Sequence, residues 1–281
     1  MTEILGRKIT DELRRAPLGV FDSGLGGLTV VRALRARCPS ESIVYLGDTA
    51  RVPYGTRSPE TILKYAKGCA DLLTRRGVKA LVVACNTVSA VALDMLRVEL
   101  DLPVLGVIVP GARAAVEAAG GHPIGILATT GTIASGAYPR AIASLSTRSE
   151  VIGQSAPLLV ALAEEGWLEG EVPRLAVRRY VEPLVTRGAR CIVLGCTHFP
   201  LLHQTIVAEA MSLAGRDIAV VDSAQATADD VAKFLDERGL AAPPRTDATL
   251  KLNVTDVPKS FIEVAARFLG HEVDAVEEVD L

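Results

Sequence analysis

The feature that most constrains the fold is an internal repeat centred on two cysteines. The segments TRRGVKALVVACNT (residues 74–87) and VTRGARCIVLGCTH (residues 185–198) align without a gap. Each reads as a helix end with arginine, a glycine suited to the left-handed helix stop, a basic residue, and an apolar strand followed directly by cysteine. The matched residues are Gly77 and Gly188, Lys79 and Arg190, and Cys85 and Cys196. Two unrelated strand–helix units could look alike by chance, but cysteines at the same strand end argue against it.

The repeat extends outward in both directions. The strand GVFDS (residues 19–23) resembles GILAT (residues 125–129), and LPVLGVI resembles DIAVVDS further along each copy. Short apolar runs alternate with longer amphipathic stretches, which predicts parallel sheets with crossover helices. The predicted strands are Leu18–Phe21, Ser42–Leu46, Leu81–Ala84, Val104–Val107, Ile124–Ala128, Ala189–Leu194 and Ile218–Val221. The predicted helices are Leu28–Arg37, Pro59–Arg76, Ser89–Glu99, Ala112–Ala119, Val172–Thr186, Ala226–Arg238 and Pro258–Leu269.

These patterns predict an α/β fold of two pseudo-symmetric, doubly wound parallel-sheet domains, with the active site in the cleft between them. The first domain is expected to be discontinuous, formed by residues 1–110 and 223–281, and the second to span residues 111–222. A chain of 281 residues is long enough for two medium-sized cores. Aromatic residues make up only 4% of the chain, so Val, Leu, Ile and Ala must build those cores.

Composition narrows the choice of partners and compartment. The net charge is −3, and basic residues are scattered, so nucleic-acid binding is not expected. No apolar run reaches the roughly 18 residues of a membrane helix. Residues 1–16 carry charges of both signs and are predicted to be a short N-terminal extension rather than a secretory signal. Five cysteines without a signal indicate free thiols and a cytoplasmic protein.

Polar groups follow several of the predicted strands, where open α/β sheets bind their ligands. They are Asp22-Ser23, Cys85-Asn86-Thr87, Thr129 to Thr132, Cys196-Thr197-His198 and Asp222-Ser223. Thr87 is predicted to cap the next helix, and Pro200 suits the first helical turn after His198. A helix N-terminus carries partial positive charge, so we expect it to lower the cysteine pKa and to help bind a carboxylate.

Two thiols in equivalent places suit one kind of reaction. Inverting a carbon centre by proton transfer requires removal of a proton from one face and delivery to the other. Two related domains facing across a cleft would present Cys85 and Cys196 from opposite sides. The sequence carries no recognisable pyridoxal-phosphate lysine motif, so deprotonation without a cofactor is possible. We predict neither a cofactor nor a metal.

Cys38, Cys69 and Cys191 are expected to be buried core residues, Cys191 within a strand.

Several other interpretations of the site remain open. A metal site drawn from Cys85, Cys196, His198 and His203 lacks paired-ligand spacing, and a hydrolase built on Cys196 and His198 needs a contact that alternate residues make poorly. The glycine-rich stretch at residues 24–27 matches neither phosphate-loop motif but could cradle a carboxylate. Two lobes around a cleft also describe a solute-binding protein.

Five segments resemble the glutamate racemase family, within the wider aspartate/glutamate racemase superfamily. They are GVFDSGLGGLTV (19–30), GDTARVPYGT (47–56), VACNT (83–87), IGILATTGT (124–132) and LGCTHFP (194–200). The resemblance implies interconversion of L- and D-glutamate without cofactor, supply of D-glutamate for peptidoglycan synthesis, and a homodimer. A racemase, isomerase or decarboxylase acting on another acid is the alternative within the superfamily.

The resemblance also implies roles for individual residues. Cys85 would be the base for D-glutamate, assisted by Asp22, and Cys196 the base for L-glutamate, assisted by His198. Glu164 matches the family's acidic residue near the second thiol. The stretch before it departs from the usual Cys-Pro pattern, which leaves Glu165 as an alternative. The residues expected to hold the substrate are Asp22, Ser23, Tyr54, Gly55, Asn86, Thr87, Thr130, Thr197 and His198.

Overall fold

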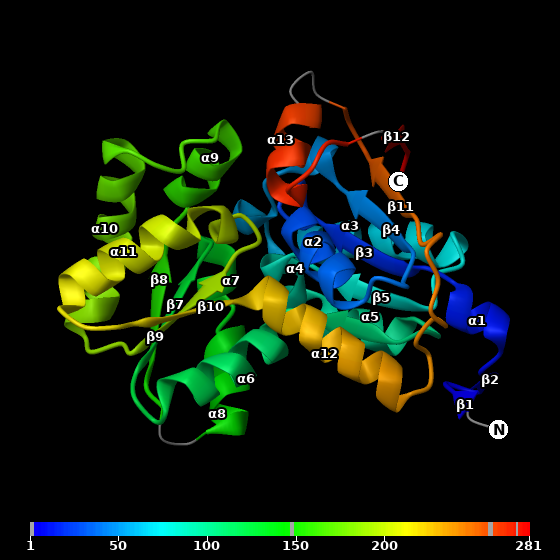
Figure 1. The fold of residues 1–281 in the computed structure, drawn as a ribbon, viewed down its shortest axis with the longest axis horizontal. Helices are drawn as coiled ribbons and strands as arrows, with labels where there is room; N and C mark the ends of the chain where they lie inside the picture. Colours follow the sequence, from blue (N-terminus) through cyan, green and yellow to red (C-terminus); the bar gives the residue numbers. More distant parts are fainter. Residues whose placement is uncertain (1–2, 147–148, 258–260, 274) are drawn as a thin grey trace.

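The protein folds as two parallel β-sheets, each covered on both faces by helices (Figure 1). The computed structural model describes residues 3–146, 149–257, 261–273 and 275–281. The strands are β1 (Glu3–Ile4), β2 (Arg7–Lys8), β3 (Leu18–Asp22), β4 (Ile43–Gly47), β5 (Ala80–Val83), β6 (Val104–Gly106), β7 (Ile124–Ala128), β8 (Val151–Ser155), β9 (Cys191–Gly195), β10 (Ala219–Asp222), β11 (Leu250–Val254) and β12 (Glu277–Glu278).

The helices connect these strands in chain order. They are α1 (Asp11–Arg15), α2 (Leu28–Arg37), α3 (Pro59–Arg75), α4 (Asn86–Val91), α5 (Leu93–Glu99), α6 (Ile108–Ala119), α7 (Thr130–Ala134), α8 (Ala137–Leu145), α9 (Leu158–Glu165), α10 (Glu171–Thr186), α11 (His203–Ala214), α12 (Ser223–Glu237) and α13 (Phe261–Leu269). Three short 3₁₀ turns are η1 (Thr49–Arg51), η2 (Tyr54–Thr56) and η3 (Phe199–Leu202).

The strand order confirms the internal repeat. The larger sheet runs β12-β11-β4-β3-β5-β6 and the smaller runs β8-β7-β9-β10, with every described pairing in both sheets parallel. The order β4-β3-β5-β6 is therefore the same as β8-β7-β9-β10. In each copy the strand order changes direction between the first strand and the strand that precedes the cysteine, which is between β3 and β5 and between β7 and β9. Such a switch point leaves a crevice for a ligand.

The inner faces of the two sheets share one hydrophobic core. Val20 and Val82 of the larger sheet belong to the same buried cluster as Ile126 and Val193 of the smaller one. Helices α6 and α12, where the chain crosses between the sheets, fill the space between them with small residues. The residues from these two helices are Ile108, Ala112, Ala115, Ala119, Ala224, Ala228, Val231 and Leu235. The two units are thus packed together rather than joined only by linkers.

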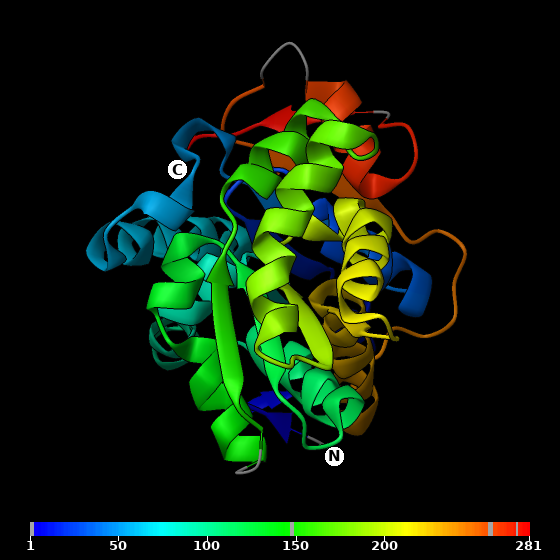
Figure 2. The same ribbon diagram turned by 90° about the vertical axis from the view of Figure 1, so that its left-hand side faces the viewer.

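Separate clusters cover the outer faces. On the larger sheet, α3, α4 and α5 pack over alternate strand residues such as Phe21 and Leu81. On the smaller sheet, α9, α10 and α11 pack over Leu127 and Leu194. Figure 2 shows α10 and α11 side by side on that outer face. Buried residues of one parallel strand thus alternate between two cores, as expected for strands covered on both faces.

Most predicted elements are present, and the differences have local causes. Gly77 and Gly188 both adopt the expected left-handed conformation, with φ of 74° and 87°. The predicted helix Ser89–Glu99 is instead two helices, α4 and α5, separated at Ala92. The helix cap is Cys85 and not Thr87, because the Thr87 hydroxyl bonds Thr129 and Thr132 of the other unit. Helix α6 begins at Ile108 rather than Ala112.

Other elements were not among the residue ranges predicted, although helical turns were expected after Thr129–Thr132 and after His198. The elements outside the predicted ranges are β1, β2, β8, β11, β12, α1, α7, α8, α9 and α11. Strand β8 reads VIGQS, is only partly buried and lies at the sheet edge, so it lacks a continuous apolar run. The predicted last helix is present as α13, whereas its first three positions, 258–260, lie outside the described residues. The strands divide between the sheets in line with the proposed units, whose boundaries stay a prediction.

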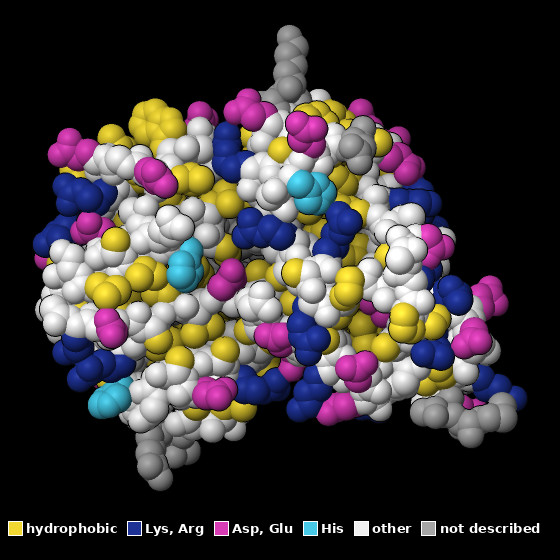
Figure 3. All heavy atoms as spheres, viewed as in Figure 1, with side chains coloured by type: hydrophobic (Ala, Val, Ile, Leu, Met, Phe, Trp, Pro, Cys, Tyr) yellow, Lys and Arg dark blue, Asp and Glu magenta, His cyan; other side chains and the backbone are white. Residues whose placement is uncertain are grey.

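Charged side chains of both signs are mixed on one face of the molecule. On the face drawn in Figure 3, Lys and Arg side chains are interspersed with Asp and Glu and do not gather into one basic patch. In the described ranges, no helix is long and apolar enough to cross a membrane.

The repeat has diverged at the basic residue after each helix-stop glycine. The Lys79 side chain is fully buried, with Nζ 2.5 Å from Oε2 of Glu41, and it also donates to the carbonyl oxygens of Arg14 (2.6 Å) and Leu240 (2.9 Å). Arg190, at the equivalent position, is exposed. We expect Lys79→Met to lower the free energy of unfolding by about 3–5 kcal/mol, because it leaves the Glu41 carboxylate buried without its cation.

Urea denaturation of both variants measures this difference. Arg190→Met is the matched control from the second copy of the repeat and should stay within about 0.5 kcal/mol of the parent protein. Equal losses in the two variants would contradict a buried ion pair as the cause.

Candidate active site

A cavity of about 330 Å³ lies where the carboxyl ends of the strands of one sheet meet those of the other. Its lining is drawn from both units, so that each unit supplies one cysteine. The lining residues are Ser23, Gly24, Val52, Pro53, Tyr54, Gly55, Thr56, Cys85, Asn86, Thr87, Thr129, Thr130, Pro157, Val160, Ala161, Glu164, Cys196, Thr197 and His198. All the site residues predicted from sequence are in this lining except Asp22, which lies behind it.

The first thiol, Cys85, follows β5 and caps the N-terminus of α4. Its Sγ atom lies 3.4 Å from the Ser23 hydroxyl, and only 5% of the residue is exposed. Burial, followed by the charge of Asp22, raises the pKa of Cys85 to about 12, although the hydrogen bonds with Ser23 and the Val88 N–H lower it. The expectation that the helix terminus would lower this pKa was therefore wrong, because loss of hydration outweighs the helix dipole.

Asp22 ends β3 beneath the cavity and has no exposed surface. Its carboxylate accepts a hydrogen bond from the Gly24 N–H at 3.0 Å and another from the Thr197 hydroxyl at 3.5 Å. Burial raises the pKa of Asp22, while the charge of His198 lowers it. The carboxylate thus links the first unit to the Cys196 loop of the second, and it acts on Cys85 through its charge.

The second thiol, Cys196, follows β9 and lies beside an imidazole. Its Sγ atom is 3.8 Å from Nδ1 of His198, whose Nε2 is 2.9 Å from Oε1 of Glu164. Burial lowers the pKa of His198, but the contacts with Cys196 and Glu164 more than compensate and raise it to about 10. His198 is therefore held as an imidazolium between the Glu164 carboxylate and the Cys196 sulfur.

Glu164, rather than Glu165, faces the cavity. The hydrogen bond with His198 holds the pKa of Glu164 below its usual value. Its backbone is held in turn by Arg267 of α13, which donates to the Glu164 carbonyl oxygen at 2.5 Å. The ring of Phe268 meets His198 edge-on, with ring centroids 5.1 Å apart. Sequence reasoning missed this contact, because α13 carries no motif that marks it as part of the site.

The segment at residues 48–56 forms one wall of the cavity. Buried Asp48 accepts hydrogen bonds from the Tyr54 hydroxyl and from Arg51 Nε, the latter at 2.9 Å. It also accepts one at 2.8 Å from the hydroxyl of Thr255, the residue after β11. The Arg51 guanidinium also stacks 4.3 Å above the Tyr65 ring. Because the Tyr54 hydroxyl is occupied by Asp48, Tyr54 offers the cavity its ring and backbone rather than a free donor.

Hydroxyl groups join the two units next to this segment, where Gly55 lies against Thr129. Oγ1 of Thr87 lies 3.0 Å from Oγ1 of Thr129 and 3.2 Å from that of Thr132. Thr130 pairs with Ser155 at 2.7 Å. Among the cavity residues that the structure describes there is no lysine or arginine, so an anionic ligand would be held by N–H and O–H groups and by His198.

The arrangement suits proton transfer at a carbon between two thiols. Cys85 and Cys196 come from topologically equivalent strand ends of opposed units, and they are close enough for the charge of Cys196 to affect the pKa of Cys85. Within the described ranges, no group of three or more His, Cys, Asp or Glu side chains could hold a metal ion.

Comparisons with known proteins agree with this geometry. The family model for Asp/Glu/Hydantoin racemase matches residues 28–231. A glutamate racemase of Syntrophus aciditrophicus (strain SB) is 47% identical over 265 residues, which cover 94% of this chain and 97% of that protein. The chain belongs to the glutamate racemase family. It is therefore an amino-acid racemase, and the alternatives of a solute-binding protein and a thiol hydrolase are wrong.

Solved structures of the family share the whole fold. The glutamate racemase of Thermus thermophilus, in complex with β-chloro-D-alanine, is 41% identical with a TM-score of 0.85. That of Francisella tularensis, in complex with D-glutamate, is 33% identical with a TM-score of 0.87. Both matches cover 95% of this chain and 98% of the other. The Escherichia coli glutamate racemase, in complex with L-glutamate and the activator UDP-MurNAc-ala, is 28% identical with a TM-score of 0.74 and coverages of 94% and 98%.

The remaining thiols of this family member lie outside the cavity. Cys69 and Cys191 are buried in α3 and β9, as predicted, whereas Cys38 is only partly buried at the end of α2. Burial raises the pKa of all three, to about 11 for Cys38 and about 12 for the other two. They are therefore protonated at neutral pH.

The raised pKa of His198 makes stability depend on pH. A pKa of about 10 in the folded protein, against 6.5 in the unfolded chain, stabilises the folded state fully below pH 6.5. This stabilisation is lost as the pH rises from 6.5 through 10. We expect the difference in unfolding free energy between the parent protein and His198→Asn to shrink across that window, as measured by urea denaturation at several pH values.

Glu164→Gln provides the control for this pH dependence. It removes one of the two contacts that raise the His198 pKa. The difference in unfolding free energy between Glu164→Gln and His198→Asn should therefore disappear at a lower pH than the difference between the parent protein and His198→Asn. A difference between parent and His198→Asn that stays constant from pH 6.5 to 10 would rule out the raised pKa.

Proposed function

We propose that this chain interconverts L- and D-glutamate by proton transfer between Cys196 and Cys85. The observation that carries the proposal is the pair of thiols presented to one cavity from equivalent strand ends of two opposed units. The substrate follows from the relatives, since the solved Francisella and Escherichia enzymes hold D-glutamate and L-glutamate respectively.

In the L-to-D direction, the Cys196 thiolate removes the α-proton and becomes a thiol. The electron pair left on the α-carbon is shared with the carboxylate, and the carbon becomes planar. The Cys85 thiol then delivers its proton to the opposite face and becomes a thiolate. The two cysteines have exchanged protonation states, and proton exchange with solvent or a turnover in the other direction restores them.

The electrostatics distinguish the two thiols before substrate binds. Buried Cys85 beside Asp22 holds its proton, whereas Cys196 lies beside the imidazolium of His198. For D-glutamate, Cys85 must first lose its proton, and Asp22 is the neighbouring group that can accept it.

Neutral donors would hold the substrate's carboxylates. The Nδ2 atom of Asn86 is buried and has no hydrogen-bond partner in the part of the chain that the structure describes, although the Oδ1 atom is bonded. Ser23, Thr130 and Thr197 place hydroxyl groups in the same lining. Such donors bind an anion without adding a positive charge that would hold a thiolate permanently.

Three further proposals concern the setting of the reaction. D-glutamate would supply peptidoglycan synthesis, the enzyme would act in the cytoplasm, and two copies would form a homodimer. They are supported by membership of the family. The division into residues 1–110 with 223–281 and residues 111–222 is also a proposal, supported by the distribution of strands between the sheets.

Isotope exchange in D₂O tests the two-thiol reaction. Without added cofactor, the parent protein should convert L-glutamate to D-glutamate that carries deuterium at the α-carbon. Cys85→Ala should lower racemisation by about 10²–10⁴-fold, because the second proton donor is missing. It should still exchange the α-proton of L-glutamate without inversion, and Cys196→Ala should do so only with D-glutamate.

Chiral chromatography and NMR of the α-deuterium measure both effects. Cys38→Ala is the matched control, because its thiol lies outside the cavity, and its racemisation rate should equal that of the parent. Full racemisation by either cavity variant would exclude the two-thiol mechanism, whereas no exchange by the parent would exclude glutamate as the substrate.

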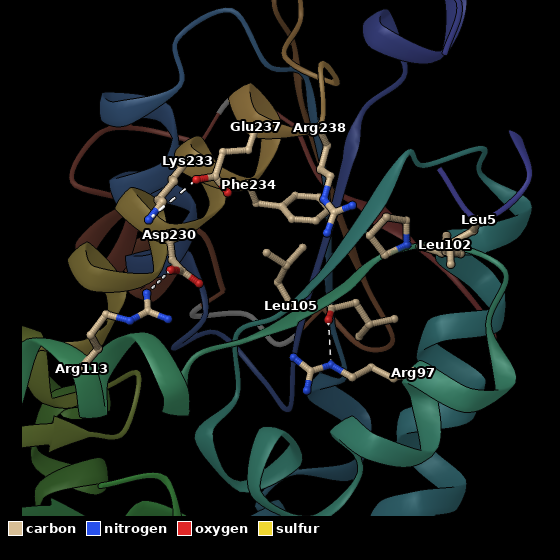
Figure 4. A pocket seen from close by; sticks show the side chains of 12 residues that line it. Leu5, Arg97, Leu102, Leu105, Arg113, Asp230, Lys233, Phe234, Glu237 and Arg238 are labelled. Carbon is tan, nitrogen blue, oxygen red and sulfur yellow. Dashed lines mark hydrogen bonds and ion pairs between the residues drawn. The ribbon is translucent and has the colours of Figure 1, made fainter. Parts of the chain in front are cut away.

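A second cavity supports a proposal about regulation. It has a volume of about 480 Å³ and is lined by residues of β6, α6 and α12. Neither Cys85 nor Cys196 belongs to its lining. Figure 4 shows Arg97, Arg113, Lys233 and Arg238 around an apolar floor that includes Phe234 and Leu105. Arg113 pairs with Asp230, Lys233 with Glu237, and Arg97 with Asp94 outside the lining, which leaves Arg238 without an ion pair among the described residues. We infer that this cavity takes an anionic effector of the kind bound by the Escherichia enzyme.

The effector proposal is tested with UDP-MurNAc-ala itself. It should raise kcat/KM of the parent protein, and Arg238→Ala should require roughly tenfold more of it for the same effect, since one charge-assisted contact is lost. Arg190→Ala, an exposed arginine remote from this cavity, is the control. No response of the parent at saturating UDP-MurNAc-ala, or an unchanged response of Arg238→Ala, would contradict the proposal.

A further inference from the structure

Tyr138 is buried at the boundary between the two units and contacts both thiol-bearing segments. It lies in the first turn of α8, and only 1% of it is exposed. Its ring packs so closely on Gly195, the residue before Cys196, that a Cβ atom there would lie 3.1 Å from Cε2 of the tyrosine. Its hydroxyl donates to Oδ1 of Asn86, the residue after Cys85, at 2.8 Å.

The same side chain lies against both segments that cross between the sheets. A Cβ atom on Gly111 of α6 would come within 3.4 Å of the tyrosine hydroxyl and 3.3 Å of the Ser223 side chain at the start of α12. A Cβ atom at Gly195 would be crowded by Ala128 as well as by the tyrosine ring, and one at Gly111 would be crowded by Ser223 and would touch the tyrosine hydroxyl. Tyr138 therefore occupies the point where the two units join, and its hydroxyl is the part that reaches the active site.

The hydrogen bond fixes which end of the Asn86 carboxamide is free. Oδ1 accepts from Tyr138, while Nδ2 is buried without a partner among the described residues, and Asn86 lines the cavity. Leaving a buried amide donor unpaired costs free energy, which a bound acceptor would recover. Burial raises the pKa of Tyr138, so the phenol stays neutral and remains a donor at neutral pH.

We propose that Tyr138 is a positioning residue for the racemase reaction. It holds the Asn86 carboxamide in the orientation that directs the N–H₂ group at a substrate carboxylate. Without the phenol, the amide can rotate and present its oxygen to the carboxylate, which repels it. This inference rests on the proposed function, since it requires a carboxylate substrate in the cavity.

A double-mutant cycle between Tyr138 and Asn86 tests the proposal. Tyr138→Phe should lower kcat/KM for L-glutamate by about 10-fold, mostly through a higher KM, because it removes a binding orientation and no reacting group. Asn86→Ala should lower it at least as much. In the Asn86→Ala background, Tyr138→Phe should cause no further loss, because the group it positions is gone.

Tyr180→Phe on the outer helix α10 is the matched control and should leave both kcat and KM unchanged. Parent-like KM in Tyr138→Phe would overturn the inference. Losses that add in the double variant, or a lower melting temperature with unchanged KM, would show a purely structural tyrosine and also overturn it.

If Tyr138→Phe does not fold, Asn86→Asp provides the second measurement. It keeps an acceptor for the tyrosine but removes the N–H₂ donor, so the KM for glutamate should rise at least 10-fold. An unchanged KM in this variant would overturn the inference. A parent protein that does not racemise glutamate would instead refute the proposed function, which the same assay distinguishes.

Discussion

The two thiols share one cavity because the inner faces of both sheets pack into a single hydrophobic core. Parallel strands bring all their carboxyl ends to one edge, but this alone would give two separate edges. Helices α6 and α12 fill the space between the sheets with alanines, which lets the units approach closely. The facing edges then enclose about 330 Å³, the scale of a small-molecule site. Every polar contact across the cavity depends on that apolar packing.

Three of the polar contacts between the units at the cavity involve buried groups. Asp22 accepts from Thr197, Thr87 meets Thr129, and Tyr138 donates to Asn86. Buried hydrogen bonds contribute little net stability when made but cost more when broken. They therefore fix the relative position of the two units more than they hold the units together, and the core supplies most of the stabilisation.

The sequence predicted the strands with continuous apolar runs and the residues that directly follow them. Cys85, Asn86, Thr87, Thr197 and His198 all reach the cavity for that reason. Prediction failed where the signal depends on a partner far away in the chain. The edge strand β8 becomes a strand only by pairing with β7.

The supporting residues of the site could not be predicted for the same reason. Asp48 has a role because Tyr54 and Thr255 meet it, and Arg267 because α13 lies over the end of α9. The pKa of Cys85 was misjudged because a helix terminus can be read from sequence, whereas complete burial beside Asp22 cannot. The sequence thus identified the reacting groups better than their energetics.

Duplication has produced equivalent geometry without equivalent chemistry. In the aligned copies, Asp22 corresponds to Ala128, and Asn86-Thr87 corresponds to Thr197-His198. One thiol therefore lies by a carboxylate and the other by an imidazole. L- and D-glutamate have equal free energies, so the ratio of kcat/KM in the two directions must equal their equilibrium constant whatever the protein does. The asymmetry can change how kcat and KM divide in each direction and how they depend on pH, but any change in kcat/KM must be the same in both directions. No arrangement of the two thiols can therefore alter the final proportion of the enantiomers, only the rate at which it is reached.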